Sequence, residues 1–322
     1  MSASSPQTSS QQTSSQQTSS PHTSLLAGHA VSRVGFGAMQ LAESGVDRDA
    51  AIRVLRRAVD LGVNHIDTAD FYGDGVANRL IRDALGPYPD DLVLVSKLGA
   101  VHHPHEVLVP AQRPEQLRAG VEDNLRNLGV ERVDVINLRR ADAQPGIIAT
   151  GDQRVDLDAQ LAELVALRDE GKIGAIGLSN VSVDQLTAAL PVGIVCVQNY
   201  FSLLRRTDQP VLELCRQQGI AYVPYFPLGS AFSGLPQVTG HPAVVEIAER
   251  IGATPAQVGL AWLLQHDQQI LLIPGTAKIN HLEQNVAAGK IILDQAAMMI
   301  LDRTTASAAE IAAEEQLFAP RG

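Results

Sequence analysis

The sequence predicts an α/β protein that folds as one (β/α)8 barrel of the TIM type, and three observations favour this fold class. Eight short apolar runs, each typical of a buried strand, alternate along the chain with segments of helical periodicity. The chain has no long stretch of strands alone or helices alone, a pattern that favours a parallel sheet with helical crossovers. Eight such units within about 270 residues have the size of a closed barrel.

The expected strands lie, in order, in the runs SRVGFGAMQL, NHIDTA, DLVLVSK, VDVINL, IGAIGLS, IVCVQN, AYVPYF and QILLIPG. Apolar residues at helical spacing indicate helices at 49–61, 113–128, 156–170, 183–190 and 211–218. A further helix is expected from Pro255, because Thr254 provides an N-cap hydroxyl and Gln257 completes a capping box. The alternative fold is an open doubly wound sheet, but the GxGxxG turn that usually follows its first strand is missing.

Residues 1–24 are expected to be a disordered tail, and residues 25–322 a single domain. The tail repeats Gln-Thr-Ser-Ser three times, and such a polar, almost uncharged segment buries too little apolar surface to offset its chain entropy. A partner-binding or modified tail is the alternative. No linker or change of composition follows residue 25.

Composition and charge exclude several classes of protein. Of 322 residues, 45% are hydrophobic and 19% charged, and the net charge of −10 argues against a nucleic-acid-binding surface. No apolar run reaches the roughly 18–20 residues of a membrane span, and no secretory signal begins the chain, so a cytoplasmic location is expected. Cys196 and Cys215 form neither a redox pair nor a zinc motif and are expected to be small buried hydrophobes. Nothing implies a metal site or a protein partner.

Polar residues at the carboxyl ends of the strands are the candidates for chemistry, because barrels place their active sites there. Asp67 ends the second strand, Tyr72 follows five residues later, and Lys97 ends the third strand. Burying a lysine is costly unless its charge is paired, and this chain contains only four lysines. The alternative is a strand-end lysine that simply reaches water.

Seven segments between residues 30 and 290 resemble the aldo-keto reductase superfamily, and they follow one another in the same order as in that superfamily. They are GVNHIDTADFYG, LVLVSK, LRNLGVERVDVINL, GAIGLSN, VCVQN, YFPLGS, and LIPGT with HLEQN. The resemblance implies an NADPH-dependent enzyme that reduces an aldehyde or ketone, with Tyr72 as general acid and Asp67 and Lys97 as its partners. A free tyrosine has a pKa of about 10. We expect the ammonium to lower that pKa, while the carboxylate keeps the lysine charged.

Arg139 stands where the superfamily usually has a histidine, at the end of the fourth strand in INLRR. This departure, with GAMQLA, DNLRNLG and LAWLLQ, resembles the bacterial pyridoxal reductases, also called pyridoxine 4-dehydrogenases. That branch implies reduction of pyridoxal to pyridoxine. Arg139 would orient the carbonyl group and favour the phenolate. Alternatively, it merely forms an ion pair with Asp134 or Asp142.

The resemblance also implies the residues that bind NADPH. Ser179, Asn180 and Gln198 would hold the nicotinamide amide, and Tyr225 would stack on its ring. The turn from Phe226 to Ser230 would offer backbone amides to the pyrophosphate, and a helix beginning near His281 would offer amides to phosphate oxygens. Lys278 would contact the 2′-phosphate. The remaining expected contacts are Gly37, Met39, Leu228, Gly229, Ile273, Gly275, Thr276, Glu283 and Asn285.

Other features carry weaker interpretations. His102, His103 and His105 have a spacing that can bind a metal, but a loop lining the substrate pocket is preferred. A helix at 300–318 is expected to pack on the barrel. Three rival functions remain: reduction of another aldehyde, an NADPH-binding regulatory barrel with little turnover, and an aldolase that uses Lys97 as a nucleophile.

Overall fold

The structure, a computed structural model, describes residues 22–103, 106–144, 146–229 and 236–317. Its strands are β1 (Thr23–Leu26), β2 (His29–Ser32), β3 (Phe36–Gly37), β4 (His65–Asp67), β5 (Val93–Leu98), β6 (Ala100–His103), β7 (Glu106–Pro110), β8 (Val133–Arg139), β9 (Ile173–Ser179), β10 (Ile194–Gln198) and β11 (Ala221–Tyr222). Its α-helices are α1 (Arg48–Asp60), α2 (Val76–Leu85), α3 (Pro114–Leu128), α4 (Leu157–Asp169), α5 (Val183–Ala189), α6 (Gln209–Gln218), α7 (Pro242–Ile251), α8 (Pro255–His266), α9 (Ile279–Ala288), α10 (Gln295–Arg303) and α11 (Ala308–Leu317).

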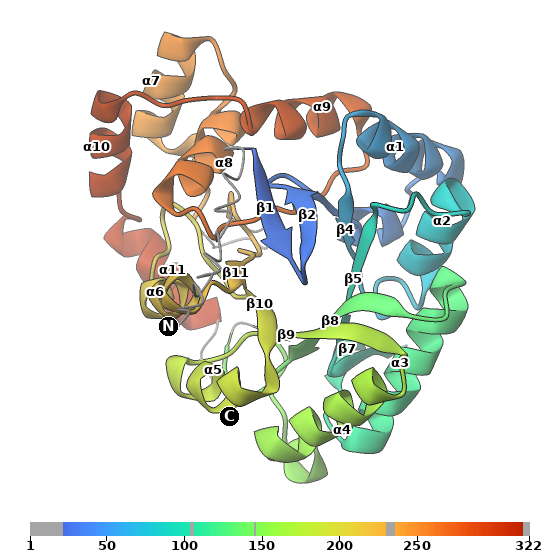
Figure 1. Cartoon of the computed structure of the whole chain (residues 1–322). Helices are drawn as coiled ribbons and strands as arrows, with labels where there is room; N and C mark the ends of the chain where they lie inside the picture. Colours follow the sequence, from blue (N-terminus) through green and yellow to red (C-terminus); the bar gives the residue numbers. More distant parts are fainter. Residues whose placement is uncertain (1–21, 104–105, 145, 230–235, 318–322) are drawn as a thin grey trace, which may run out of the picture.

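Seven of these strands form one parallel sheet in the order β11-β10-β9-β8-β5-β4-β3. The sheet curls into a ring, and the helices lie around its outside (Figure 1). The α/β class, the parallel sheet and the helical crossovers predicted from the sequence are therefore confirmed.

The run QILLIPG contributes backbone bridges instead of a regular strand. Ile270 makes a parallel bridge with Tyr222 of β11, and Leu272 makes one with Val34, next to β3. The amide of Leu272 donates to the Arg33 carbonyl at 2.9 Å. The two edges of the seven-stranded sheet therefore contact the same segment.

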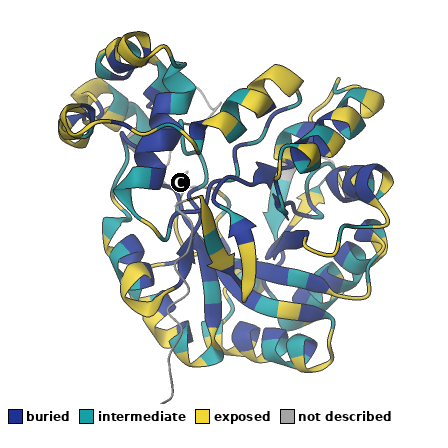
Figure 2. Ribbon diagram, turned by 45° about the horizontal axis from the view of Figure 1, so that its top comes forward, coloured by how far each residue is buried: buried dark blue, intermediate teal, exposed yellow. Residues whose placement is uncertain are grey.

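Alternation along the strands produces two apolar clusters. In β5, Leu94 packs in the cluster between sheet and helices, whereas Val93 and Val95 belong to the cluster inside the curled sheet. Leu26 and Val31, from the hairpin formed by β1 and β2, join this inner cluster. Figure 2 shows the buried residues concentrated along the strands and on the inner faces of the helices. The hairpin thus covers one end of the ring, and the carboxyl ends of the strands face the other.

Several boundaries expected from the sequence are wrong. Thr23 and Ser24, assigned to the tail, lie in β1, while residues 1–21 lie outside the described part of the chain. The first expected strand is short, because Met39–Ala42 forms a 3-10 turn after β3. The expected terminal helix consists of α10 and α11 with a break at 304–307. The start of α9 at Ile279 agrees with the expected start near His281.

Two expectations, the start of α8 and the state of the cysteines, are confirmed. The Thr254 hydroxyl accepts from the Gln257 amide at 3.2 Å, and the Gln257 side chain accepts from the Thr254 amide, which is the expected capping box of α8. Cys196 and Cys215 are buried and free. Among the helices in the described ranges, none has the length and apolar character needed to cross a membrane.

Candidate active site

The registers of the parallel strands bring the expected catalytic residues to one end of the sheet. Asp67 is the last residue of β4, and Lys97 is the last residue but one of the neighbouring β5. Arg139 ends β8 and pairs in register with Ser179 at the end of β9, and Ser179 pairs with Gln198 at the end of β10. Residues far apart in the sequence therefore share one rim, as the barrel prediction requires.

A buried ion pair occupies the centre of this rim. The Lys97 ammonium donates to Asp67 Oδ1 and, at 3.1 Å, to the Thr68 carbonyl. The Gln198 amide donates to Asp67 Oδ2 at 2.6 Å. Both members of the pair are under 10% exposed. The lysine charge is thus compensated in the way that a buried ammonium requires, and the alternative of a lysine that merely reaches water does not hold.

Tyr72 lies beside this pair on the loop between β4 and α2. Its ring centre is 5.2 Å from the Lys97 ammonium nitrogen. Burial raises the pKa of Tyr72 above its usual value, and the charge and hydrogen bond of Lys97 oppose that rise. The expectation of a lowered pKa is therefore wrong in its net direction, although the contribution of Lys97 has the expected sign. For Lys97, burial lowers the pKa, but Asp67 and then Tyr72 outweigh burial, so its net pKa is raised and the lysine stays charged.

Arg139 is not the partner of either carboxylate considered from the sequence. Asp142 forms its ion pair with Arg140 at 2.6 Å, and Asp134 contacts Arg132. Burial lowers the pKa of Arg139, while the neighbouring Tyr225 and Tyr72 favour its charged form. Arg139 therefore places a cation at the strand rim, within electrostatic reach of Tyr225 and Tyr72.

An apolar wall completes the surroundings of Tyr72. Phe71 and Tyr72 contact edge to face, with ring centres 5.2 Å apart. Leu108 of β7 and Ile147 pack against the same small cluster, which also contains Ala69 and Ala100. The site combines an apolar face with a cation, and this combination suits a flat organic ligand that carries negative charge. These wall residues were not predicted, because isolated hydrophobic residues in loops and in a short hairpin give no signal in the sequence.

The residues expected around the nicotinamide lie at the same rim. Ser179 and Gln198 are buried, and Gln198 Oε1 has no hydrogen-bond partner among the described residues. Asn180 has a positive φ of 59°, and its side-chain Nδ2 donates to the Ala143 carbonyl at 2.7 Å and to the Arg140 carbonyl at 3.2 Å. The Tyr225 hydroxyl donates to Asn180 Oδ1 at 3.3 Å. Asn180 thus connects the loop after β8 to the ring of Tyr225.

The ends of β3 and of the QILLIPG run meet closely beside this rim. A Cβ on Gly37 would lie 2.5 Å from the Ile273 carbonyl oxygen, and one on Gly275 would lie 2.6 Å from the Gly37 carbonyl oxygen. Gln40 also contacts Gly275, a neighbour that the sequence did not suggest. Only glycine fits at these two positions, so two backbone segments line one edge of the site.

The more distant expected contacts lie along α9 and the loop after β11. Lys278 is the exposed N-cap of α9, and Thr276 accepts from its amide at 3.1 Å. Glu283 is exposed and bound to Arg57 at 2.7 Å, a cation that sequence reasoning missed. The remaining expected contacts in the described ranges are Met39, exposed at the start of its turn, Phe226 and Gly229 with positive φ, Leu228, and Asn285 in α9. Ser230 lies outside the described residues.

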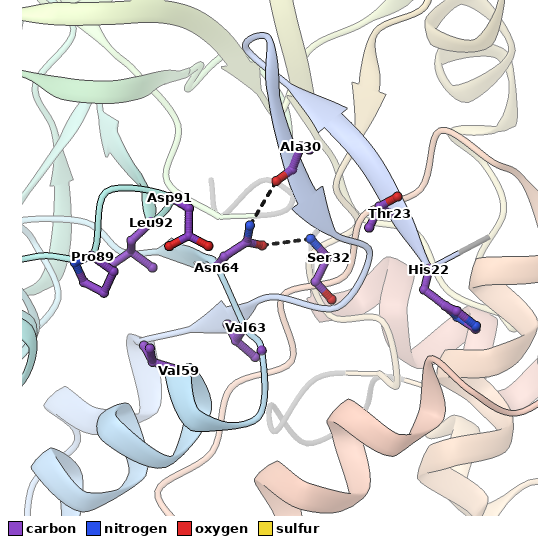
Figure 3. A pocket seen from close by; sticks show the side chains of 11 residues that line it. His22, Thr23, Ala30, Ser32, Val59, Val63, Asn64, Pro89, Asp91 and Leu92 are labelled. Carbon is purple, nitrogen blue, oxygen red and sulfur yellow. Dashed lines mark hydrogen bonds between the residues drawn. The ribbon is translucent and has the colours of Figure 1, made fainter. Parts of the chain in front are cut away.

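A separate hollow lies on the opposite face of the molecule. It has a volume of about 320 Å³ and lies between the β1–β2 hairpin, α1 and the loop before β5 (Figure 3). Asn64 crosses it, with Oδ1 accepting from the Ser32 amide at 2.8 Å and the side-chain nitrogen donating to the Ala30 carbonyl at 2.9 Å. None of Asp67, Tyr72, Lys97 or Arg139 lines this hollow, so it is separate from the chemistry.

The histidine-rich segment lies in the β6–β7 hairpin, whose Ala100 and Leu108 belong to the apolar cluster around Tyr72. His102 and His103 end β6, which pairs with β7 as an antiparallel hairpin directly after β5. His105 lies outside the described residues. Within the ranges that the structure describes, no group of three or more histidine, cysteine or acidic side chains could hold a metal ion.

Residues 33–306 match the family model described as the aldo/keto reductase family. The chain belongs to this family. It is 45% identical over 279 residues to pyridoxine 4-dehydrogenase of Escherichia coli (strain K12), an alignment that covers 85% of this chain and 94% of that protein. It is 37% identical over 280 residues to an uncharacterised oxidoreductase of Schizosaccharomyces pombe, which covers 84% of this chain and 86% of that protein.

Solved structures of aldo/keto reductases are similar to the whole described fold. The enzyme from Klebsiella pneumoniae in complex with NADP and acetate matches with a TM-score of 0.74 and 28% identity. The match covers 88% of this chain and 94% of that one. The resemblance to aldo-keto reductases inferred from seven sequence segments is therefore confirmed, and the class of oxidoreductase with it.

Proposed function

We propose that this aldo/keto reductase reduces pyridoxal to pyridoxine with NADPH, and that Tyr72 is the proton donor. The observation that carries the proposal is the rim of the sheet, where Tyr72 lies beside the buried Lys97–Asp67 pair and Arg139. The name of the E. coli relative, pyridoxine 4-dehydrogenase, supports the substrate. Buried free thiols are consistent with the cytoplasmic location expected from the sequence.

The residues of this rim divide the work of carbonyl reduction. NADPH, when bound, supplies a hydride to the carbonyl carbon. Tyr72 transfers its phenolic proton to the carbonyl oxygen, and solvent later returns a proton to the phenolate. Lys97 stabilises the developing phenolate by its charge. Asp67 holds the Lys97 ammonium in place, and the Gln198 side chain holds the Asp67 carboxylate.

The orphaned oxygen of Gln198 supports a nicotinamide site. Gln198 Oε1 is a buried acceptor, and a carboxamide N–H would satisfy it. Ser179 would complete the amide contact, and the ring of Tyr225 would stack on the nicotinamide. Asn180 would contact the carboxamide through its side-chain Oδ1, which would then accept from the nicotinamide in place of the Tyr225 hydroxyl. Its side-chain Nδ2 is not available, because it already donates to two backbone carbonyls.

NADPH rather than NADH is favoured by the lysine and the backbone amides at the start of α9. The first amides of α9 point out of the helix and are available to a phosphate. Lys278 at the N-cap brings positive charge to this end of the site, whereas the charge of Arg57 is paired with that of Glu283 at 2.7 Å. Leu228, Gly229 and Ser230 would cover the pyrophosphate.

We infer that the sheet closes into a complete (β/α)8 barrel. The segment 270–272 bridges β11 on one side and the residues before β3 on the other, so it has the position of an eighth strand. Closure of this kind removes both edges of the sheet and forms a continuous rim for the loops.

Arg139 is proposed to select the substrate. Pyridoxal carries a phenolic hydroxyl next to its 4-aldehyde, and this hydroxyl is ionised or nearly so close to neutral pH. The planar guanidinium could donate to both oxygens at once, which a histidine could not do. The apolar wall of Phe71, Leu108 and Ile147 would contact the faces and edges of the pyridine ring.

The test compares pyridoxal with benzaldehyde, which lacks the neighbouring hydroxyl. We expect Arg139→His to lower kcat/KM for pyridoxal about 10- to 100-fold more than for benzaldehyde, because one bidentate charge-assisted contact is lost. Turnover is followed as the decrease in NADPH absorbance. Tyr72→Phe is the control and should abolish most turnover of both substrates, by about 10²–10⁴-fold.

Each alternative result has a clear meaning. An equal loss for both aldehydes would assign Arg139 to general support of the tyrosine rather than to substrate choice. Turnover of benzaldehyde but not of pyridoxal by the wild type would leave an aldo/keto reductase of another aldehyde. Tight NADPH binding without turnover of any aldehyde would favour a regulatory barrel.

A further inference from the structure

A buried network of polar side chains lies behind the catalytic loop. We call it the asparagine network; it consists of Thr68, Asp70, Asn78, Ser96, Asn124 and Asn127. Thr68, Asn78, Ser96 and Asn124 have no exposed surface, although three of them lie in helices or strands whose neighbours are apolar. Burying so many polar groups is costly unless each is satisfied, and the hydrogen bonds here satisfy them with consistent donors and acceptors.

The network connects the loop of Tyr72 to the strand of Lys97. The Thr68 hydroxyl donates to Asn78 Oδ1 at 2.8 Å, and Asn78 Nδ2 donates to Asn124 Oδ1 at 2.9 Å. The hydroxyl of Ser96, the residue before Lys97, donates to the same Asn124 oxygen at 2.5 Å. The Lys97 ammonium in turn donates to the Thr68 carbonyl at 3.1 Å. Asn78 of α2 and Asn124 of α3 therefore bridge the two segments that carry the proton donor and its cation.

Asp70 joins the loop itself to this network. Its Oδ1 accepts from Asn78 Nδ2 at 3.1 Å and from Asn127 Nδ2 at 2.7 Å. Its carbonyl accepts from the Gly75 amide at 2.6 Å, which closes the loop around Tyr72. Burial raises the pKa of Asp70, and the hydrogen bonds from Asn127 and Asn78 oppose that rise. The side chain of Asp70 is thus held from α2 and α3 at once.

We propose that Asp70 is a positioning residue for the proton transfer, because its bonds to Asn78 and Asn127 fix the loop that presents Tyr72 to Lys97. The inference rests on the proposed role of Tyr72 as proton donor. Asp70 does not contact the reacting atoms. Loss of its anchor lets the tyrosine hydroxyl move away from the ammonium, and small displacements of reacting groups cost large factors in rate.

Both network bonds of Asp70 end on one oxygen, and this permits a sharp comparison of variants. Asp70→Asn keeps an acceptor oxygen at that position, whereas Asp70→Ala removes it. We expect kcat of Asp70→Ala to fall about 10- to 100-fold with NADPH affinity within about twofold of wild type, because the cofactor residues are untouched. Asp70→Asn should stay within about threefold of wild type, because position rather than charge is what the loop requires.

The pH profile separates positioning from general loss of stability. The charged groups that face Tyr72 are Lys97, Asp67 and Arg139. If Tyr72 drifts from Lys97, the contribution that lowers its pKa weakens, so the basic limb of kcat moves to higher pH in Asp70→Ala and not in Asp70→Asn. Melting temperatures are measured for both variants, and assays are run well below them.

Asn127→Ala extends the test if Asp70→Ala does not fold. It removes one of the two bonds to Asp70 and is half-buried, so we expect a smaller fall of kcat with the same shift of the basic limb. The proposal is overturned if these variants keep the wild-type kcat and pH profile, or if the loss appears only in KM or in NADPH affinity. If Tyr72→Phe itself retains turnover, the proposed function fails first, and that result is distinct from normal activity in the Asp70 variants alone.

Discussion

His65 is a titratable residue inside the curled sheet that takes no part in the proposed chemistry. Its ring lies against Gly35, and neither ring nitrogen has a hydrogen-bond partner among the described residues. Burial lowers the pKa of His65 to about 4. The side chain is therefore neutral in the folded protein at neutral pH, and charging it requires placing a cation without compensation in an apolar environment.

This burial predicts an acid-dependent loss of stability. Between pH values of about 6.5 and 4 the unfolded chain binds one more proton at His65 than the folded chain, so the free energy of unfolding falls as the pH decreases. At about pH 4.5 the loss attributable to His65 is about 2–3 kcal/mol. We expect His65→Leu to lose that much less stability than wild type between pH 7 and about pH 4.5, measured by denaturant unfolding.

His29 provides the matched control, because it is exposed on β2. His29→Leu should keep the pH dependence of the wild type. If His65→Leu loses as much stability as wild type on acidification, the group responsible is not His65.

For single residues, the sequence allowed the charged residues of the site to be predicted, but it did not show which polar side chains are buried. Asp67 and Lys97 could be found because a charged residue at the end of an apolar strand is conspicuous. Asn78 and Asn124 could not, since a polar residue in an amphipathic helix usually faces water. The net pKa of Tyr72 was missed for the same reason: the sequence shows which charges are near, whereas the desolvation of the ring depends on loops that pack only in the fold.

The β1–β2 hairpin is the element that the sequence missed most clearly. Its turn is formed by Ala27 and Gly28, both at positive φ, and the strands pair from Thr23 with Ser32 to Leu26 with His29. Composition suggested a boundary after residue 24, since Thr23 and Ser24 continue the polar character of the repeat. Tertiary pairing overrides that composition, because backbone hydrogen bonds do not depend on side-chain polarity. The seven-stranded sheet, by contrast, was predictable from apolar runs that are buried on both faces.

Two truncations test this boundary. Removing residues 1–21 should leave the melting temperature unchanged, because a polar repeat is expected to make few contacts. Removing residues 1–24 also deletes the pairs of Thr23 with Ser32 and Ser24 with Val31, as well as the bond from the Arg33 amide to the His22 carbonyl. That variant should melt several degrees lower with unchanged kcat/KM. Equal melting temperatures would show that these pairs do not stabilise the fold.

The terminal helices show how a local break arises from distant contacts. Helical periodicity suggested one helix over 300–318, but α10 ends at Arg303. Arg206 donates to the carbonyls of Leu301, Asp302 and Thr304, and it lies 4.6 Å from the ring centre of Trp262. These bonds satisfy carbonyls that would otherwise continue the helix. A sequence window of one helix cannot reveal an arginine almost a hundred residues away.

At the scale of the whole molecule, the two ends of the curled sheet have different tasks. The carboxyl ends of the strands hold Tyr72, Lys97 and Arg139, while the hairpin end is covered by Leu26 and Val31. The hairpin end is therefore apolar, whereas the buried Lys97–Asp67 ion pair lies at the rim formed by the carboxyl ends of the strands. In barrels of this type the amino-terminal face contributes stability and the carboxyl-terminal face contributes chemistry.

A pair of amide side chains, one at each end, tests this division. Asn64 joins the hairpin to the segment before β4 by two hydrogen bonds, and Asn64→Ala leaves the Ser32 amide without its acceptor (Figure 3). We expect a loss of about 1–3 kcal/mol in the free energy of unfolding, with kcat and NADPH affinity unchanged. Gln198→Ala removes the donor to Asp67 and the proposed nicotinamide acceptor, so it should weaken NADPH binding and lower kcat. Unfolding in denaturant and NADPH titration are measured on both variants. A fall of kcat in Asn64→Ala would mean that the hairpin end transmits strain to the rim, because the inner cluster connects the two ends through Val93 and Val95 of the strand that carries Lys97.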